Sequence, residues 1–344
     1  MPIFPIFLSA AIKFDEKQDK LNKSALTEIN TTITINDFPG SLNNWTWAKN
    51  QGYCTGTGTV SNPYVISELF FSTSTTMWNC LSIHHSRKHF IVRDSEFKGH
   101  SQYAGVQLYN TTNGVITENF MYPFTGALVW LFNASDNVIR NNNASAGFFY
   151  GILIDSAAGL TRYNTVSDNL ITHNIAAGIQ FRGGVSKFNT VSDNDIFNNT
   201  LGIEMGAFAD NNTIRGNHIV NSSSIGLFIN TVSQGNEIYE NCFFTNNIDA
   251  NDNGFNNFWD NGVRGNYWDI YNGSDANSDG IGDVPYNITG IAGSQDNFPL
   301  MSCPTPTTSP PPGIPGFDLF LILLASGASI IGIIIISNKK KSKP

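Results

Sequence analysis

Short apolar runs that end in asparagine recur along the middle of the chain at an interval near 24 residues. Two neighbouring examples, NTVSDNLI from Asn164 and NTVSDNDI from Asn189, are nearly identical. In each segment an apolar residue is followed three positions later by asparagine, and these asparagines are 23, 27, 25, 23 and 24 residues apart. They are Asn119, Asn142, Asn169, Asn194, Asn217 and Asn241. A fixed period of this kind predicts a repeat architecture.

A glycine followed by apolar residues marks the same period a second time. It occurs at Gly105, Gly126, Gly151, Gly178, Gly202 and Gly226. The apolar positions are mainly Ile, Val and Phe in short alternating runs, which favour strands, whereas leucine-rich repeats need a leucine-dominated pattern and often a helix. Each unit therefore predicts three short strands separated by turns. The expected fold is all-β, a right-handed parallel β-helix solenoid with three strands per coil.

Successive coils of a β-helix stack at about 4.8 Å, so equivalent side chains lie above one another. The inward Ile, Val and Phe side chains then form apolar stacks, and the repeated asparagines form a ladder of bonded amides. We expect each ladder asparagine at a bend, where asparagine tolerates left-handed backbone angles and bonds the turn. Apolar segments at Tyr64, Cys80 and Phe90 predict two further coils before these six.

The pattern also divides the chain into segments. In order, they are a leader-like segment at 1–12, an N-terminal cap at 13–54, the β-helix at 55–255, a C-terminal cap with an acidic loop at 256–303, a Pro/Thr-rich stalk at 304–316, a transmembrane helix at 317–337 and a basic tail at 338–344. Residues 319–336 are 18 uncharged residues, long enough as a helix to cross most of a hydrocarbon core. The lysines that follow mark the cytoplasmic side. We expect a single-pass membrane protein with an extracytoplasmic ectodomain.

The charge composition argues against a nucleic-acid-binding protein. Only 13% of the residues are charged, and the formal net charge is −8. Four of the 19 basic residues are lysines of the tail, so the rest of the chain has 15 basic against 27 acidic residues. Such a surface repels nucleic-acid phosphates, and we expect no nucleic-acid partner.

The four cysteines are dispersed and contain no CxxC pair, which argues against a disulfide framework or a zinc cluster. They are Cys54, Cys80, Cys242 and Cys303. Because Cys54 and Cys80 are about one coil apart, a disulfide between adjacent coils remains open.

After Asn256 the period stops and an aromatic, acidic segment begins. A solenoid needs a distinct last unit because an open final coil exposes apolar core and a sheet edge. The aromatic residues expected to close it are Trp259, Tyr267, Trp268, Tyr271 and Tyr286.

Within this segment, four oxygen-bearing residues match positions 1, 3, 5 and 9 of an EF-hand-type calcium loop. They are Asp275, Asn277, Asp279 and Asp283, with Gly280 at the position of the sharp turn. Position 12, where such loops carry glutamate, is Tyr286. A structural Ca²⁺ site and a solvated turn therefore both remain open.

The repeat and its closing segment together resemble a known family. The tandem Asn-x-[Val/Ile]-x-x-Asn coils, the segment GNYWDIYNGSDANSDGIGDVPY and the later DNFPL are similar to NosD-type parallel β-helix proteins with PbH1 repeats, over residues 55–301. The segment at 56–66 resembles the first coil of surface-anchored members, many of them archaeal. The resemblance implies a periplasmic or surface β-helix. Founding members act in copper-site maturation of nitrous oxide reductase, and carbohydrate-active enzymes share the fold.

The residues give the copper role no support. A copper site needs clustered His, Met or Cys side chains. His84 and His85 are adjacent, so on a strand they point to opposite faces, and His173 and His218 lie nearly two coils apart. We expect these histidines to be turn or surface residues, and a NosD-like copper maturation factor stays an alternative.

A polysaccharide lyase or hydrolase is the other alternative. Glycosidases need two acids about 5–9 Å apart. The candidate acids are Asp155, Glu204, Asp168 and Asp193. Asp168 and Asp193 precede ladder residues and are expected at equivalent turns of adjacent coils, where two carboxylates can bind a cation or raise each other's pKa. The basic and aromatic candidates are Arg182, Lys187, Trp130, Tyr150 and Phe181.

These candidates do not form a complete catalytic constellation. The sequence therefore favours an anchored surface protein with a structural role or a binding role, for a glycan or another surface protein.

Overall fold

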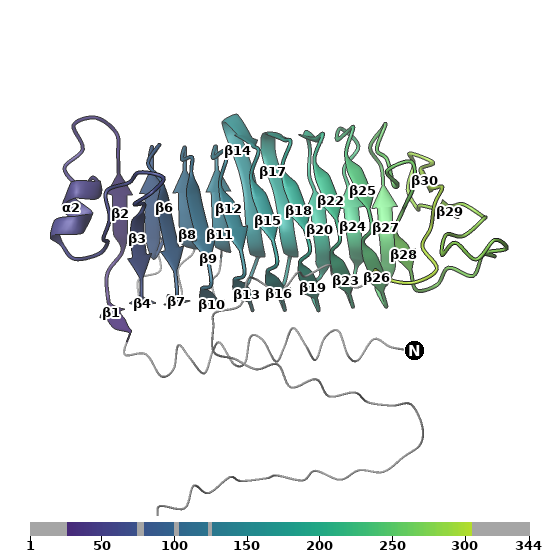
Figure 1. Cartoon of the computed structure of the whole chain (residues 1–344), viewed down its shortest axis with the longest axis horizontal. Coiled ribbons are helices and arrows are strands. Elements are labelled where there is room, and N and C mark those ends of the chain that lie inside the picture. Colours follow the sequence, from purple (N-terminus) through teal and green to yellow (C-terminus); the bar gives the residue numbers. More distant parts are fainter. Residues whose placement is uncertain (1–25, 74–78, 100–102, 123–125, 305–344) are drawn as a thin grey trace, which may run out of the picture. The chain divides into compact units, whose positions relative to one another are not determined.

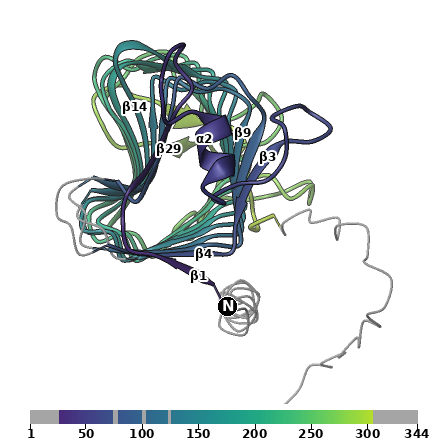
Figure 2. The same ribbon diagram turned by 90° about the vertical axis from the view of Figure 1, so that its left-hand side faces the viewer.

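The computed structural model describes residues 26–73, 79–99, 103–122 and 126–304, and their strands wind into a parallel β-solenoid (Figure 1). Each coil contributes strands to three sheets, which form the three sides seen along the solenoid axis in Figure 2. The third sheet contains eight strands, so the prediction of six recognised coils and two earlier ones is confirmed.

The leader-like segment, the transmembrane helix, the basic tail and all of the stalk except Pro304 lie outside the described residues. Within the described ranges, no helix is long and apolar enough to cross a membrane.

We refer to the three sheets as A, B and C. In order along the stack, sheet A contains β1 (Thr27–Ile29), β4 (Leu69–Thr73), β7 (Glu96–Gly99), β10 (Phe120–Tyr122), β13 (Asn143–Ser145), β16 (Leu170–Thr172), β19 (Asp195–Phe197), β23 (His218–Val220), β26 (Cys242–Phe244) and β28 (Tyr267–Trp268). Sheet B contains β2 (Ile33–Asn36), β5 (Leu81–His84), β8 (Ala104–Tyr109), β11 (Ala127–Phe132), β14 (Tyr150–Arg162), β17 (Ala177–Lys187), β20 (Leu201–Met205), β24 (Ile225–Ile229) and β27 (Ile248–Asp252), with β21 (Ala209–Asp210) beside β17. Sheet C contains β3 (Tyr64–Ser67), β6 (Phe90–Arg93), β9 (Gly114–Thr117), β12 (Val138–Arg140), β15 (Thr165–Ser167), β18 (Thr190–Ser192), β22 (Thr213–Arg215) and β25 (Glu237–Tyr239).

The core consists of apolar side chains stacked in register from coil to coil. In sheet C, one such stack is Ile116, Ile139, Val166, Val191, Ile214 and Ile238, all with no exposed surface. Branched side chains suit this position because they pack closely on a pleated surface. Burying one such side chain stabilises the fold by about 1.5–3 kcal/mol, so the repeated pattern itself supplies the core.

The bends that precede the ladder residues use left-handed backbone. The residue just before each ladder asparagine has a φ between 53° and 65°. These residues are Glu118, Asn141, Asp168, Asp193, Gly216 and Glu240. The expectation that the ladder asparagine itself takes the left-handed angle is therefore wrong. The preceding residue makes the turn, and the asparagine side chain is buried between coils.

Five of the six glycines of the predicted period occupy equivalent positions in their coils. Gly151, Gly178, Gly202 and Gly226 occupy successive coils of sheet B, and a Cβ on Gly178 would lie 2.7 Å from the carbonyl oxygen of Gly202. Gly126 is out of register, because Ala127 pairs with Ala104 and so Leu128, not Gly126, lies opposite Gly105.

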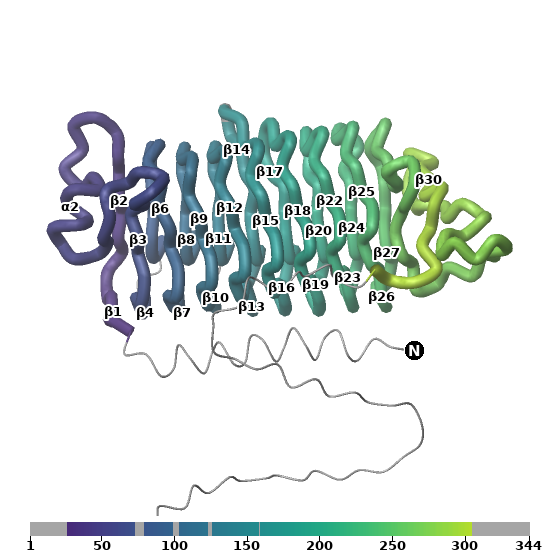
Figure 3. The backbone as a smooth tube through the Cα atoms, in the orientation of Figure 1, coloured from purple at the N-terminus to yellow at the C-terminus, as the bar shows by residue number. Residues whose placement is uncertain are grey.

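Segments outside the repeat cover both ends of the solenoid (Figure 3), and each end contains buried aromatic residues. At the N-terminal end, α2 (Trp45–Asn50) places Trp45 against Tyr64 with ring centroids 4.5 Å apart. The cap region predicted at 13–54 also contributes strands, since β1 pairs with β4 and β2 pairs with β5.

At the C-terminal end, Trp268 stacks between Phe243 and Tyr286, at 4.5 and 4.4 Å. Trp259 is also buried, and the hairpin of β29 (Tyr286–Asn287) and β30 (Gln295–Asp296) follows. Tyr267 instead packs outside sheet A, against Val220, Cys242 and Phe244.

Candidate functional site

The six predicted ladder asparagines lie in one file where sheet C passes into sheet A. Each side-chain Nδ2 donates to the Oδ1 of the next asparagine at 2.9–3.0 Å, and the file continues from Asn241 to Asn266. All six are buried, at 1% exposure or less. Their polar groups are used between coils and are not offered to a ligand.

A second file of asparagines lies where sheet B passes into sheet C, and it was missed in the sequence. It consists of Asn137, Asn164, Asn189, Asn212, Asn236 and Asn257, joined by amide hydrogen bonds of 2.9–3.2 Å. The signal was present, because the first five of these residues begin the repeat segments, five positions before each ladder asparagine. This file is also structural.

Aromatic and polar side chains gather instead on the outer side of sheet B. One row crosses β8, β11, β14, β17 and β20 and consists of Gln107, Trp130, Leu153, Gln180 and Glu204. The adjacent row crosses β8, β11, β14 and β17 and consists of Tyr109, Phe132, Asp155 and Arg182. Tyr150, at the start of β14, is outside both rows, but its ring lies beside Arg182. We name this surface the Trp130 face, and it comprises Tyr109, Trp130, Phe132, Tyr150, Asp155, Gln180, Arg182 and Glu204. Four strand spacings from β8 to β20 make it about 19 Å long.

Asp155 and Arg182 lie at the centre of the Trp130 face. The Asp155 Oδ2 accepts hydrogen bonds from Arg182 Nη2 at 2.7 Å and from Trp130 Nε1 at 3.2 Å. The Asp155 side chain is 8% exposed and that of Arg182 is 44% exposed. The Arg182 guanidinium also lies 5.9 Å from the Trp130 ring centroid and 5.8 Å from that of Tyr150. Aromatic surface and hydrogen-bonding groups therefore meet at one place.

Arg182 remains protonated at this site. Burial lowers the pKa of Arg182, but its hydrogen bond to Asp155 and the charge of that carboxylate outweigh burial, so the net shift is upward. A group that holds its proton this firmly is a hydrogen-bond donor and a poor general base.

Glu204 lies on the same face and accepts a hydrogen bond from Gln180 Nε2 at 2.7 Å. Burial raises the pKa of Glu204, and the Gln180 hydrogen bond opposes that shift. Asp155 and Glu204 are on β14 and β20, with β17 between them, so their backbones are about 10 Å apart across the sheet. Asp155 pairs with Arg182 and Glu204 pairs with Gln180, so the two acids are also offset by two residues along the strands.

The structure separates the other candidates for sugar chemistry from the Trp130 face. Phe181 is fully buried in the core, so it cannot stack on a sugar. Lys187, near the end of β17, forms an ion pair with Asp210 at 3.2 Å. Asp168 and Asp193 occupy equivalent left-handed bends in adjacent coils, beyond sheet C. Burial raises the pKa of Asp168, and the neighbouring charge of Asp193 adds to this.

His84 and His85 do not point to opposite faces as predicted. His85 has a φ of 56°, so the strand has already turned at this residue. As a result both imidazole rings lie near Tyr109, with centroids 5.3 and 5.0 Å away. The pair extends the aromatic rows of the Trp130 face towards the N-terminal end.

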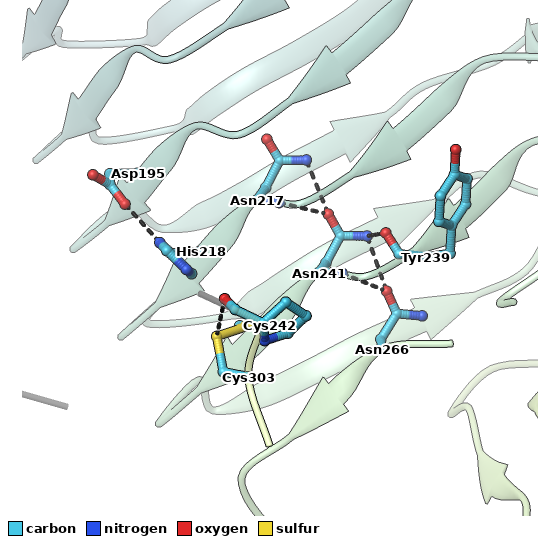
Figure 4. Close-up of a disulfide and its surroundings, with 9 residues drawn as sticks. Asp195, Asn217, His218, Tyr239, Asn241, Cys242, Asn266 and Cys303 are labelled. Atoms are coloured by element: carbon cyan, nitrogen blue, oxygen red, sulfur yellow. Dashed lines mark hydrogen bonds and ion pairs between the residues drawn. A yellow bond between two sulfur atoms is a disulfide. The ribbon is translucent and has the colours of Figure 1, made fainter. Parts of the chain in front are cut away.

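The cysteine pairing differs from the alternative left open by the sequence. A disulfide joins Cys242 of β26 to Cys303, with Cα atoms 5.6 Å apart (Figure 4). Cys54 and Cys80 are both buried thiols, so they are not the pair that forms a disulfide. Cys303 is 61 residues beyond its partner, and no period in the sequence connects the two.

His218 belongs to the same corner and is not a surface residue. It is 4% exposed, and its Nδ1 lies 2.8 Å from the Asp195 Oδ1. Its ring and the two sulfur atoms place three ligand-type atoms within 4.8 Å of one another. Among the described residues, this is the one group of three or more His, Cys, Asp or Glu side chains that lie so close. The expectation that His218 is isolated from other chelating residues is therefore wrong.

The acidic loop forms a network of short turns. The Asp275 carboxylate accepts the backbone N–H groups of Asp279 and Gly280 at 3.1 and 3.0 Å, and Gly280 has a φ of 85°. Asp279 in turn accepts hydrogen bonds from the Asn277 amide at 2.8 Å and the Ile281 N–H at 2.8 Å. The Asp283 carboxylate accepts the Ala276 N–H at 2.8 Å. The carboxylates thus stabilise the loop directly, and the calcium prediction stays a prediction.

Two family profiles match the chain. One, described as right handed beta helix region, matches residues 53–207, and the other, described as periplasmic copper-binding protein (NosD), matches residues 184–273. Together with the three-sheet solenoid, they identify the chain as a right-handed β-helix protein of the NosD type. No curated protein sequence resembles the chain closely enough to count as a match.

Several solved structures have a related backbone. The A-module of the Azotobacter vinelandii mannuronan C-5 epimerase AlgE4 aligns with 12% identity and a TM-score of 0.46, covering 59% of this chain and 67% of that one. The periplasmic alginate epimerase AlgG aligns with 15% identity and a TM-score of 0.33, covering 66% and 72%. The Dettilon tailspike protein aligns with 11% identity and a TM-score of 0.32, covering 70% and 61%. Likeness at this level concerns the fold alone.

Proposed function

We propose that the protein is an extracytoplasmic β-helix, tethered by residues 317–337, whose Trp130 face binds neutral glycans without cleaving them. The observation that carries the proposal is the meeting of Trp130, Tyr150 and the Asp155–Arg182 pair on one outer surface. The membrane tether follows from the uncharged segment and the lysines after it.

The Trp130 face has the two kinds of group that sugar recognition uses. Partly exposed aromatic rings offer flat apolar surface for the C–H face of a pyranose, and Trp130, Phe132 and Tyr150 are each neither buried nor fully exposed. Sugar hydroxyls need both donors and acceptors, which Arg182 supplies as donor and Glu204 and Asp155 as acceptors. The order of these groups along about 19 Å suits an oligosaccharide of several rings.

The charge balance favours neutral sugars over acidic ones. The Arg182 cation is compensated by Asp155 at 2.7 Å, so it offers little net attraction to a sugar carboxylate. The chain as a whole carries a formal charge of −8, which repels polyanions at low ionic strength. A neutral polymer does not need a net positive charge to bind and is not repelled by the negative charge of the chain.

Binding of the full chain to a set of neutral and acidic oligosaccharides tests this proposal. The chain is purified in a polyoxyethylene detergent, because glycoside detergents would compete for the site. Trp130→Ala should raise the Kd for the best neutral glycan at least about tenfold, the size expected for removing a central aromatic contact. Phe258→Ala removes an aromatic ring that is 56% exposed and lies far along the chain from the Trp130 face, and it should leave the Kd unchanged. Absence of neutral-glycan binding, or equal effects of both variants, would reject the proposal.

A carbohydrate-active enzyme is the second candidate, favoured by the raised pKa of Glu204, which is the property of a general acid. Incubation of the full chain with neutral and charged polysaccharides, followed by product analysis, separates the two candidates. Turnover that is abolished by Glu204→Gln or Arg182→Ala would replace binding with catalysis as the function.

A NosD-like role in copper maturation remains the third candidate, and it rests on the family alone. A stoichiometric copper titration of the oxidised full chain, in which the disulfide keeps Cys242 and Cys303 from binding a metal, decides it, since a maturation factor should have a tight site.

A further inference from the structure

We propose that the corner formed by His218, Cys242 and Cys303 is a redox-controlled site for a thiophilic d¹⁰ cation, with Zn²⁺ as the reference ion. The disulfide closes the site, and its reduction opens a ligand set of two thiolates and one imidazole. This inference concerns a different surface from the Trp130 face and does not depend on glycan binding.

The fold builds the site from one column of sheet A. Asp195 of β19 pairs with His218 of β23, and His218 pairs with Cys242 of β26, so the three side chains stand on consecutive coils. After the C-terminal cap, the chain returns along the outside of sheet A and brings Cys303 to Cys242. The parallel register and the returning segment therefore place the His, Cys and Cys ligand atoms within 4.8 Å of one another.

Asp195 orients the His218 ring, as a carboxylate that holds a metal-binding histidine does. The Asp195 Oδ1 lies 2.8 Å from Nδ1 of His218, which fixes the proton on that nitrogen in the neutral ring. Figure 4 shows the other ring nitrogen turned towards the cysteine pair. A carboxylate, an imidazole and a metal in this sequence are a recurrent arrangement, because the carboxylate sets the tautomer and raises the basicity of the ligand nitrogen.

The surroundings suit a soft cation. Cys242 is 1% exposed and packs with Val220 and Phe244, and Tyr267 and Phe197 lie against the same cluster. Two thiolates and an imidazole are ligands that Zn²⁺ prefers, and a structural ion completes its tetrahedron with water or another group. Two thiolates also neutralise the charge of a divalent ion, so the bound site adds no net charge to this apolar corner.

The switch is a thiol–disulfide exchange. An external dithiol transfers two electrons and two protons to the Sγ atoms of Cys242 and Cys303, the bond between them breaks, and the dithiol becomes a disulfide. Zn²⁺ then displaces the two thiol protons to solvent as it binds. Oxidation of the two thiolates by an external disulfide reverses the sequence and releases the ion.

The test compares the oxidised full chain with the chain reduced by dithiothreitol and freed of it anaerobically, both in detergent. The reduced chain should bind one equivalent of Zn²⁺ and, with Co²⁺ as probe, give a thiolate-to-cobalt charge-transfer band, and the oxidised chain should do neither. Asp195→Asn should weaken Zn²⁺ binding to the reduced chain by about tenfold. His173→Ala changes an exposed histidine and should have no effect.

The double variant Cys242→Ser, Cys303→Ser retains Cys54 and Cys80, so it shows whether the band comes from this corner. A band that persists in the double variant, or a reduced wild-type chain that binds neither ion, would overturn the proposal. Far-UV circular dichroism of each reduced sample verifies that the solenoid is intact. Should Asp195→Asn be unfolded, Cys303→Ser alone, at the half-buried end of the described chain, must still abolish the band.

Discussion

Truncation of Asn194 in the middle of the ladder should cost several kcal/mol of folding free energy. Its Nδ2 donates to the carbonyl oxygens of Val166 and Ser192 and to the Asn217 Oδ1, at 2.9, 3.0 and 2.9 Å. Its Oδ1 accepts the backbone N–H and the Nδ2 of Asn169, at 3.0 and 2.9 Å. The side chain is fully buried, so water cannot replace these partners.

The magnitude follows from the groups that lose a hydrogen-bond partner. Asn169 Nδ2 still donates to two carbonyl groups, and Asn217 Oδ1 still accepts the Asn194 N–H, so these groups remain satisfied in Asn194→Ala. The Asn169 N–H is left without its acceptor and the Val166 carbonyl loses a donor, whereas the Ser192 carbonyl keeps the Asp168 N–H at 3.3 Å. At about 1–3 kcal/mol for a buried group left unsatisfied, we expect a loss of about 4 kcal/mol. A loss of this size is exceptional for a single substitution and would indicate a buried network.

Asn194→Asp separates hydrogen bonding from shape, because it keeps the acceptor for Asn169 and replaces the donor by a carboxylate oxygen facing three other oxygens. It should destabilise the fold at least as much as alanine at neutral pH. Asn247→Ala, at an exposed asparagine of the same solenoid, is the matched control and should change stability by less than about 0.5 kcal/mol. The assay is urea denaturation of the full chain, followed by far-UV circular dichroism. Equal midpoints for Asn194→Ala and Asn247→Ala would refute the ladder as a source of stability.

Two further predictions concern the C-terminal part of the solenoid. If the acidic loop binds a cation, Ca²⁺ should raise the melting temperature of the full chain, and Asp279→Ala should cancel that gain; a wild-type melting temperature insensitive to Ca²⁺ would leave the loop a solvated turn. Burial raises the pKa of Asp249 to about 6, with Asp269 adding to the shift against the Asn246 hydrogen bond. Between about pH 4 and pH 6, Asp249 is therefore still protonated in the folded chain but already ionised in the unfolded chain. The free energy of unfolding should fall by up to about 3 kcal/mol as the pH rises through this range. Burial raises the pKa of Asp296 to about 6 as well, so the slope of the denaturation midpoints across this range should fall by about half in Asp249→Asn, and an unchanged slope would show that Asp249 does not contribute.

The solenoid was predictable because its physics is local and repeated. An apolar residue three positions before an asparagine, copied at a steady interval, places the same side chain at the same height in each coil. The prediction of the Asn119-to-Asn241 file required only this period and the strand spacing. The second file follows the same rule at Asn137 and its equivalents, so one period predicts a hydrogen-bonded file wherever the repeat carries asparagine at a corner.

Predictions failed where a residue's direction depends on a local bend. His85 was assigned to the opposite side from His84 by strand alternation, but its left-handed φ of 56° ends that alternation. Gly126 matches the glycine pattern in sequence and not in register, because the pairing of Ala127 with Ala104 is set by the whole coil. Neither angle nor register can be read from residue types alone.

The class of fold, the number of coils and the identity of the stacked amides are predictable from the chain alone, since all three follow from a period and from contacts between equivalent residues. Contacts between different positions of the repeat on neighbouring coils emerge only from the three-dimensional path of the backbone. Trp130, Asp155 and Arg182 converge on sheet B because three strands carry them side by side, and Cys303 reaches Cys242 because the chain returns after the cap. Such meetings depend on the path of the backbone through space, and spacing along the chain does not encode that path outside the repeat.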